Sequence, residues 1–387
     1  MPDLSDVKVE FWGDLQVDLF TKNTAVYLAN QRLSQLISTN GRKAHRPILS
    51  HPQVGTYTPY SDIDFQRKDS EKQTLEVDTF EYSAEEIDIT DKFQTKEDLL
   101  GHSLNSIRKG LSNRIEQEYL SEIENAHHSI STSPVAVAYD NVLEILEEAE
   151  GKLGAYDAPY ETAMRAAVFG PRTVATLRRA KSERDTNLGD SVLQNGVVGP
   201  WQGWNVVQNN NLPWSADLDL ATNPTDGDTI TIAGVTLRFK DTTAEAGDVE
   251  IGTAVGDTAA NLVDAIAGDD GDYEEINIRD NFMLRRKRKI KAEYDSGDDV
   301  VKFTGYGDIA VADDLTAAGD GWDNEEQTAV FMIRGAIDMV LQFMDLKVGD
   351  KEKGFADLPK GIIGLGTKTF SDGEIMMVKM TVDASGF

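Results

Sequence analysis

The chain has 387 residues, and 40% of them are hydrophobic, which is enough to bury the cores of two or more domains. Its 38 Lys and Arg residues against 67 Asp and Glu residues give a formal net charge of -29. Such a surface repels nucleic acids and anionic membranes, so DNA binding is not expected to be the main task. The absence of cysteine excludes disulfides, thiolate metal sites and cysteine nucleophiles.

The first residues lack the basic segment and apolar run of a signal peptide. Apolar runs elsewhere fall short of the roughly 20 residues that a membrane-spanning helix needs. We therefore expect a soluble protein that has no membrane partner.

The N-terminal part is weakly patterned up to residue 20, and residues 23–38 then predict a short amphipathic helix. Its apolar face carries Val26, Leu28, Leu33 and Ile37. We expect an arm.

Residues 40–87 predict a long two-stranded hairpin. Apolar and polar residues largely alternate on its return strand, through Leu75, Val77 and Phe80. The tip is expected around Lys68 to Gln73, where charges gather, and it should be solvated or rest on a neighbouring subunit.

A long amphipathic helix is predicted over residues 91–128, with Thr95 as N-cap and its end near Asn125. The apolar stripe advances mostly by four residues, which favours a helix packed on a sheet over a coiled coil. The stripe consists of Leu100, Leu104, Ile107, Leu111, Ile115, Tyr119 and Ile123.

Shorter elements follow in residues 134–216. Asp140 should cap a helix over residues 141–150 that Gly151 stops, and a buried strand should end at Gly170-Pro171 and lead into a helix over residues 172–184. Residues 191–213 are rich in Gly and Asn turn signals and predict short strands.

Residues 217–326 look inserted, because they hold 27 acidic against 10 basic residues, about -17 of the total charge. They predict a hairpin turning at Ala233-Gly234, a helix over residues 256–268, and a strand pair over residues 281–307 turning near Ser296-Gly297. The strongly apolar residues 328–344 then predict a helix, and residues 373–385 a closing strand.

Candidate sites for chemistry are weak. Residues 361–368 (GIIGLGTK) are similar to a phosphate-binding loop, but Thr367 stands where that motif needs its lysine. The acidic cluster at residues 269–275 is dense enough for calcium, yet its spacing does not match the EF-hand, which favours a solvated loop. It contains Asp269, Asp270, Asp272, Glu274 and Glu275.

The five histidines form no metal-binding motif, and the adjacent His127 and His128 should be polar residues at a helix end. The others are His45, His51 and His102. We therefore assign no catalytic, cofactor-binding or metal-binding residue, and we expect no enzyme. The basic run Arg285 to Lys289 could contact phosphates or the acidic face of a neighbouring copy, or form a solvated strand paired with local acids.

The order of these elements resembles the major capsid proteins of tailed bacteriophages with the Hong Kong 97 fold. Residues 75–94 (LEVDTFEYSAEEIDITDKFQ) look like the return strand of that family's extended loop. Residues 161–180 (ETAMRAAVFGPRTVATLRRA) look like its strand, proline turn and helix, and residues 195–213 (NGVVGPWQGWNVVQNNNLP) are similar to its glycine-rich strand.

The resemblance implies an α+β fold with seven segments. They are an N-terminal arm (1–45), an extended hairpin loop (46–88), a peripheral domain with a spine helix (89–133), an axial domain in two parts (134–216 and 327–366), an inserted acidic α+β domain (217–326) and a C-terminal strand that returns to the peripheral domain (367–387).

The function it implies is a virion shell protein that self-assembles into the pentamers and hexamers of an icosahedral head around double-stranded DNA, without sequence specificity. A separate scaffolding protein, a portal protein and cement proteins are the partners implied. Lys68 and Lys72 have no assignable cross-linking partners, so we expect non-covalent contacts. The acidic insertion should face outward, away from DNA. The alternatives are an encapsulin-type cellular compartment and a host surface or adhesion protein.

Overall fold

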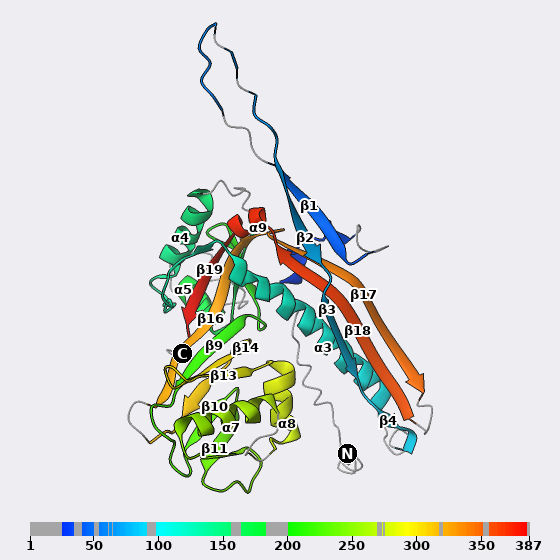
Figure 1. Ribbon diagram of the computed structural model, residues 1–387, viewed down its shortest axis with the longest axis vertical. Coiled ribbons are helices and arrows are strands. Elements are labelled where there is room, and N and C mark those ends of the chain that lie inside the picture. The colour runs from blue at the N-terminus through cyan, green and yellow to red at the C-terminus, as the bar shows by residue number, and fades with distance from the viewer. Residues whose placement is uncertain are drawn as a thin grey trace. The chain divides into compact units, whose positions relative to one another are not determined.

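The structure is a computed structural model, and it describes residues 25–34, 41–49, 54–60, 62–63, 65–90, 98–155, 164–182, 200–268, 273, 275–316, 320–350 and 356–384 (Figure 1). These residues fall into two compact units. The first contains the described parts of residues 30–111 and 337–370, and the second those of residues 25–29, 112–336 and 371–384. In the described residues, no helix is long and apolar enough to cross a membrane.

The first unit is built on antiparallel strands. A two-stranded sheet pairs β1 (Lys43–Leu49) with β2 (Ser70–Glu76), and a second sheet has the order β17 (Ile337–Asp350), β18 (Ala356–Thr369) and β3 (Thr79–Ala84), with β4 (Ile87–Asp88) also on β18. The base of the hairpin predicted over residues 40–87 is therefore present as β1 and β2. The chain after β2 continues as β3 into the second sheet.

Helix α3 (Leu99–Ser121) has 23 residues and contributes its first half to the first unit and its second half to the second. The prediction that it packs on a sheet is confirmed: a Cβ added to Gly361 of β18 would lie 2.8 Å from Leu111 and 2.9 Å from Ile107. The helix is shorter than residues 91–128. Its N-cap is Asp98, whose Oδ1 accepts the Gly101 N–H at 3.0 Å; Thr95 lies outside the described residues.

The arm helix predicted over residues 23–38 is wrong for residues 25–33, although Ser34 is helical. Only Val26–Leu28 form a 3-10 turn (η2), and Ala29 is already extended. Asn30 then bridges to β17, donating to the Ile337 carbonyl at 2.9 Å and accepting from the Met339 N–H at 3.0 Å. This strand pairing outweighs the local helical pattern.

The second unit is organised on a large sheet with the strand order β13, β14, β9, β16, β6, β8, β7, in which β19 also pairs with β16 and β5 with β19. The strands outside the insertion are β5 (His128–Ser129), β6 (Arg165–Phe169), β7 (Pro200–Trp201), β8 (Trp204–Gln208), β9 (Pro213–Asp219), β16 (Gly321–Ile333) and β19 (Met377–Asp383). Phe331 on β16 packs edge-on against Phe169 and Trp204, at centroid distances of 5.3 and 5.2 Å.

Outside the insertion, this unit includes the helices α4 (Val142–Ala155), α5 (Pro171–Ser182) and α9 (Ser371–Ile375) and the 3-10 turn η3 (Glu122–Asn125). The prediction that Gly151 stops α4 is wrong, because the helix continues to bury Leu153, which outweighs the roughly 1 kcal/mol cost of an internal glycine. Asn141 directly precedes α4, and its Oδ1 accepts the Ala138 N–H of the preceding loop at 3.0 Å.

The insertion forms its own core but shares the large sheet. A four-stranded sheet has the order β12 (Asp248–Glu250), β11 (Val235–Lys240), β10 (Thr229–Ile232) and β15 (Val311–Asp313), and helix α7 (Val255–Ala267) belongs to the same core. The turn at Ala233-Gly234 and the helix are as predicted, with Gly268 left-handed at the helix end. However, β13 (Lys291–Asp295) and β14 (Val300–Tyr306) extend the sheet through β9.

The helix predicted over residues 328–344 is wrong. That segment forms the end of β16 and the start of β17, separated by a turn in which Gly335 has φ 91°. A continuous apolar run reads equally well as a buried strand. In residues 327–384, β16 pairs with β19 in the second unit, whereas β17 and β18 pair in the first.

Candidate interaction surface

The hairpin of the first unit is anchored at its base. Ala44 of β1 and Leu75 of β2 are buried with Val77, Val340 and Phe370 in one apolar cluster. The Lys368 Nζ donates to the Thr74 carbonyl at 2.9 Å, and Lys43 pairs with Glu76 at 2.7 Å. The base is therefore fixed on β17 and β18, whereas the distal residues extend past the ends of β1 and β2 (Figure 1).

The predicted position of the tip, Lys68 to Gln73, is wrong. Ser70 pairs with Leu49 and Gln73 with Arg46, so most of that charged segment belongs to strand β2. The described distal residues are instead 54–60, 62–63 and 65–69. Pro59 and Tyr60 form a turn there, and Tyr60 has φ 71°, a conformation that suits the third residue of a type II turn but is uncommon for a bulky side chain.

Large apolar side chains are exposed on this distal segment, hereafter the hairpin tip. Tyr60 and Phe65 are 105% and 95% exposed, and Val54 is 100% exposed. Tyr57 and Ile63 are also more than half exposed. An exposed apolar group of this size marks a contact site for another molecule, because each side chain would contribute about 1.5 to 3 kcal/mol on burial.

A second apolar patch lies on the open face of the β17–β18–β3 sheet. Tyr82 stands opposite Ile362, and Phe80 opposite Gly364, in the register of β3 and β18. All three apolar side chains are exposed, and Arg42 lies 4.9 Å above the Phe80 ring. Because side chains alternate along a strand, this face is opposite the one where Gly361 meets α3.

The segment of residues 361–368 is not a phosphate-binding loop. It lies inside β18, between β17 and β3, and a Cβ on Gly366 would clash with the carbonyl oxygen of Glu76. Its glycines therefore permit close packing of strands.

The titratable candidates are dispersed. His45 is hydrogen-bonded to Thr74 at 2.9 Å, His102 lies on α3, and His127 and His128 stack edge-on with centroids 4.5 Å apart. His51 and the acids at 269, 270, 272 and 274 lie outside the described residues. Among the residues that are described, no group of three His, Asp or Glu side chains could hold a metal ion.

The basic run does not form a strand. Residues Ile278–Asn281 are a short helix (α8), and Phe282–Lys287 continue it as a π-helix. Arg285 turns inward, and its Nε donates to the Ile266 carbonyl at 2.8 Å, at the end of α7. Burial also lowers the pKa of Arg288, whose Nη1 donates to the Asn210 Oδ1 at 3.3 Å.

The apolar hairpin tip was not predicted from the sequence, because the neighbouring charges at Lys68 to Gln73 are typical of a solvated turn. The composition of residues 54–65, which contain two tyrosines, a valine, an isoleucine and a phenylalanine without a partner strand, was the available signal.

No family model and no curated protein sequence matches the chain. Solved structures do match. A structure of Mycobacterium phage Che8 is 13% identical and covers 98% of both chains, with a TM-score of 0.59. The capsid structure of the cyanophage P-SCSP1u is 12% identical and covers 98% of this chain and 94% of that one, with a TM-score of 0.54. The capsid of Ralstonia phage GP4 is 9% identical, covers 99% and 97%, and has a TM-score of 0.51.

The chain has a phage capsid fold. The predicted fold class, an α+β chain of the Hong Kong 97 capsid type, is confirmed. The capsid fold extends over nearly the whole chain, so both units and the insertion are included in the match.

Proposed function

We propose that this chain is the major capsid protein of a tailed phage and assembles into the pentamers and hexamers of an icosahedral head around double-stranded DNA. The observation that carries the proposal is the capsid fold, matched over 98% of the chain, together with a projecting hairpin that exposes apolar side chains at its tip. Its role is structural, and it performs no catalysis.

The hairpin tip binds the open face of the β17–β18–β3 sheet in a neighbouring subunit. Both surfaces are apolar and exposed, at Tyr60 and Phe65 on one side and at Tyr82 and Ile362 on the other. The hairpin tip projects past the ends of β1 and β2, so the base of the same hairpin does not cover its apolar side chains (Figure 1). Contact between copies buries both surfaces and, repeated by symmetry, links subunits into a shell.

The segments carry the roles that the resemblance implies. Residues 46–88 are the extended loop, residues 89–133 belong to a peripheral domain, and residues 134–216 belong to an axial domain. A separate scaffolding protein directs assembly, a portal protein occupies one vertex, and cement proteins reinforce the shell. DNA is enclosed without sequence specificity. The net charge of -29 repels the DNA phosphates, so the chain makes few direct contacts with DNA.

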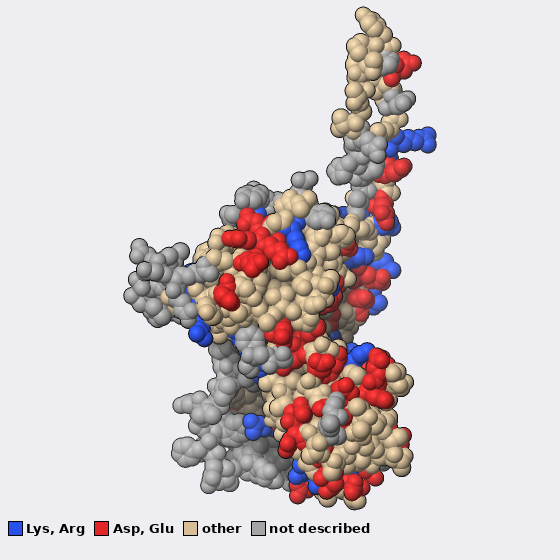
Figure 2. Space-filling view, turned by 90° about the vertical axis from the view of Figure 1, so that its left-hand side faces the viewer, with Lys and Arg blue, Asp and Glu red and all other residues tan. Residues whose placement is uncertain are grey.

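The insertion faces the outside of the shell. Figure 2 shows acidic side chains across one face of the molecule, including the lobe that carries the insertion. An interior position for residues 217–326, with 27 acidic against 10 basic residues, would repel packaged DNA. A cryo-electron reconstruction that placed this lobe in the lumen would contradict the orientation.

The experiment that tests the proposal is assembly of purified subunits, measured by sedimentation and electron microscopy. Replacing Tyr60 and Phe65 with serine removes two apolar anchors from the tip. We expect the concentration needed for assembly to rise at least about tenfold, because each 1.4 kcal/mol lost at a contact is a factor of ten.

The matched control is Tyr139→Ser, an exposed tyrosine of the second unit. It should assemble like the unchanged chain. Circular dichroism shows whether all variants remain folded. Equal assembly of the tip variant and the control would contradict the role of the tip, and a subunit that never assembles would contradict the capsid function itself.

A further inference from the structure

The insertion presents a small apolar surface with unpaired positive charge, hereafter the α8 patch, made of Ile278, Arg279, Phe282 and Arg286. Ile278 is 75% exposed and Phe282 is 44% exposed, and both arginines are exposed. Ile278, Phe282 and Arg286 follow one another at steps of four along α8 and the π-helix, so they share a stripe. Among the described residues, the structure gives the Arg279 and Arg286 guanidinium groups no ion pair.

The stripe is held on a rigid support. The Asn277 Oδ1 caps α8 by accepting the Asp280 N–H at 3.1 Å, and Leu284 is fully buried beneath the π-helix. Arg285 fastens the segment to the end of α7, and the Gln117 Nε2 donates to the Lys287 carbonyl at 3.2 Å. Because the inward side chains fix this backbone, the outward stripe is presented in one orientation and loses little entropy on binding.

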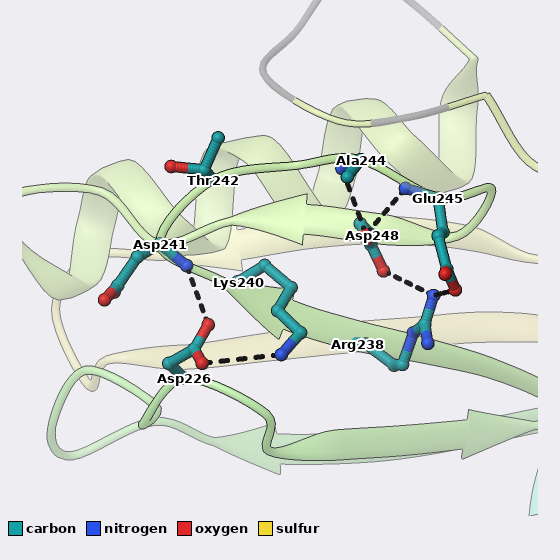
Figure 3. Close-up of a pocket in the computed structure, with 8 residues that line it drawn as sticks. All are labelled: Asp226, Arg238, Lys240, Asp241, Thr242, Ala244, Glu245 and Asp248. Atoms are coloured by element: carbon teal, nitrogen blue, oxygen red, sulfur yellow. Dashed lines mark hydrogen bonds and ion pairs between the residues drawn. The ribbon is translucent and has the colours of Figure 1, made fainter.

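A hollow of about 470 Å³ lies elsewhere in the insertion, beside β11 (Figure 3). This β11 hollow has an excess of acid. Its two basic side chains are already paired: Arg238 with Asp248 at 2.9 Å and with Glu245 at 2.7 Å, and Lys240 with Asp226 at 3.4 Å. Its charged lining consists of Asp226, Arg238, Lys240, Asp241, Glu245 and Asp248.

Two carboxylates of the hollow reach solvent, Asp241 and Glu245, although Glu245 also pairs with Arg238. Glu245 is 72% exposed in its side chain, and in Figure 3 the Asp241 side chain points away from Lys240. Four acids against two bases leave the hollow with a net negative charge. The α8 patch has the opposite charge and carries two exposed apolar side chains.

We propose that the α8 patch of one subunit docks in the β11 hollow of a second copy of this chain. Arg279 and Arg286 then face Asp241 and Glu245, while Ile278 and Phe282 lose contact with water. Two different surfaces of the same module meet head to tail, which is the arrangement that closes into rings. The inference rests on the proposed capsid function.

Charge and shape favour a protein partner over nucleic acid. The patch has two exposed arginines around an apolar centre, and a phosphate backbone offers nothing to Ile278 or Phe282. The excess of acidic residues in the insertion also repels DNA. The acidic hollow of another copy offers carboxylates to both arginines, and contact with it removes Ile278 and Phe282 from water.

The experiment uses the absence of cysteine in the chain. Two single-cysteine variants, Ile278→Cys and Ala244→Cys, are mixed, assembled and treated with a short bis-maleimide. Only contacts between different chains then give a mixed dimer that carries one of each variant. The control replaces Ile278→Cys with Ser296→Cys, which is exposed in the β13–β14 turn of the same module.

We expect mixed dimers from Ile278→Cys and Ala244→Cys in assembled particles, at least about fivefold more than from the control pair or from unassembled subunits. Arg279→Glu together with Arg286→Glu, added to the Ile278→Cys chain, should reduce the yield of mixed dimer severalfold. Asp241→Lys together with Glu245→Lys, added to the Ala244→Cys chain, should restore that yield.

Each other outcome overturns a defined part of the account. Shells that form without the mixed dimer, or with no more than the control, contradict the docking and leave the capsid function intact. Protection of Ile278→Cys against a polar maleimide only in DNA-filled heads would assign the patch to DNA and overturn the proposal. Failure of any particle to form contradicts the proposed function instead.

Discussion

At the scale of single residues, two glutamates of the second unit, Glu116 and Glu325, are buried. Glu116 on α3 is fully buried, with Oε1 accepting the Ala25 N–H at 2.9 Å and Oε2 accepting from the Asn211 Nδ2 at 2.8 Å. It joins the arm to the loop before β9. The apolar stripe of the helix predicted Ile115 and Tyr119 as buried neighbours, but gave no sign of this carboxylate.

Glu116→Leu leaves two buried donors without an acceptor. We expect the free energy of unfolding to fall by roughly 3 kcal/mol, because each unsatisfied buried group costs about 1 to 3 kcal/mol. Urea denaturation of the unassembled subunit measures this loss. Glu144→Leu, at an exposed position of α4, is the control and should change stability by less than about 0.5 kcal/mol. Equal effects of the two substitutions would contradict the assigned role.

Glu325 lies on β16 beside a cluster of charges. Its Oε1 is 3.7 Å from the Arg172 Nη1, and Arg172 is engaged with Asp308 at 2.8 Å. Burial raises the pKa of Glu325 to about 7, while Arg172 opposes the rise. The folded state therefore binds this proton more tightly than the unfolded chain does.

A raised carboxyl pKa makes the fold less stable as the pH increases. The stabilisation is complete below the unfolded pKa near 4.5 and is lost as the pH rises through about 7. We expect Glu325→Gln to increase the free energy of unfolding by roughly 1 to 3 kcal/mol at pH 8 and to change it little at pH 5. Denaturation at both pH values tests this, with exposed Asp298→Asn as control. A gain of the same size at both pH values would contradict the titration.

At the scale of elements, β18 depends on Gly361 and Gly366, which lie at points of close approach. A Cβ on Gly366 would meet the backbone of Glu76, whereas a Cβ on Gly349, in the partner strand β17, would find only the Lys360 Nζ at 3.8 Å. Gly366 therefore has no room for a side chain, whereas Gly349 has room for one, although both lie in the β17–β18 pair.

We expect Gly366→Ala to lower the free energy of unfolding by about 1 to 3 kcal/mol through overpacking, and Gly349→Ala to be nearly neutral. Thermal unfolding of both variants measures the difference. If Gly349→Ala destabilises as much as Gly366→Ala, strand propensity and not close packing explains the loss.

Turns and helix ends could be predicted from local sequence signals, whereas the strand that pairs with an apolar segment could not. The Ala233-Gly234 turn, α7 ending at Gly268, and the buried strand before Pro171 follow from residue types with one favoured conformation. The run from Thr328 to Met344 carries no such signal until Gly335. It became two strands because β6, β18 and β19 provide edges to pair with.

The interaction surface shows the same limit. The presence of a hairpin follows from alternation along its return strand, but the tip was placed among the charges at Lys68 to Gln73. The pairing of Ser70 with Leu49 moved the tip to residues 54–65. Register depends on contacts made at the base, with Ala44 and Leu75 in the buried cluster, and these lie far from the tip in sequence.

At the scale of the whole molecule, the arrangement suits a subunit that is completed by its neighbours. Each unit buries its own core, yet the hairpin tip, the open face of β3 and β18, and the α8 patch leave apolar side chains in solvent. A monomer with such surfaces would associate nonspecifically at high concentration. We propose that a closed shell buries these surfaces.

The measurement that tests this account most directly is a cryo-electron reconstruction of the particles that the chain forms when expressed with its neighbouring genes. The account predicts a closed icosahedral shell of pentamers and hexamers in which Tyr60 and Phe65 lie on β3 and β18 of an adjacent subunit. A stable monomer under every condition, including with a candidate scaffolding protein, would contradict it, as would a shell whose hairpin tips touch no other subunit.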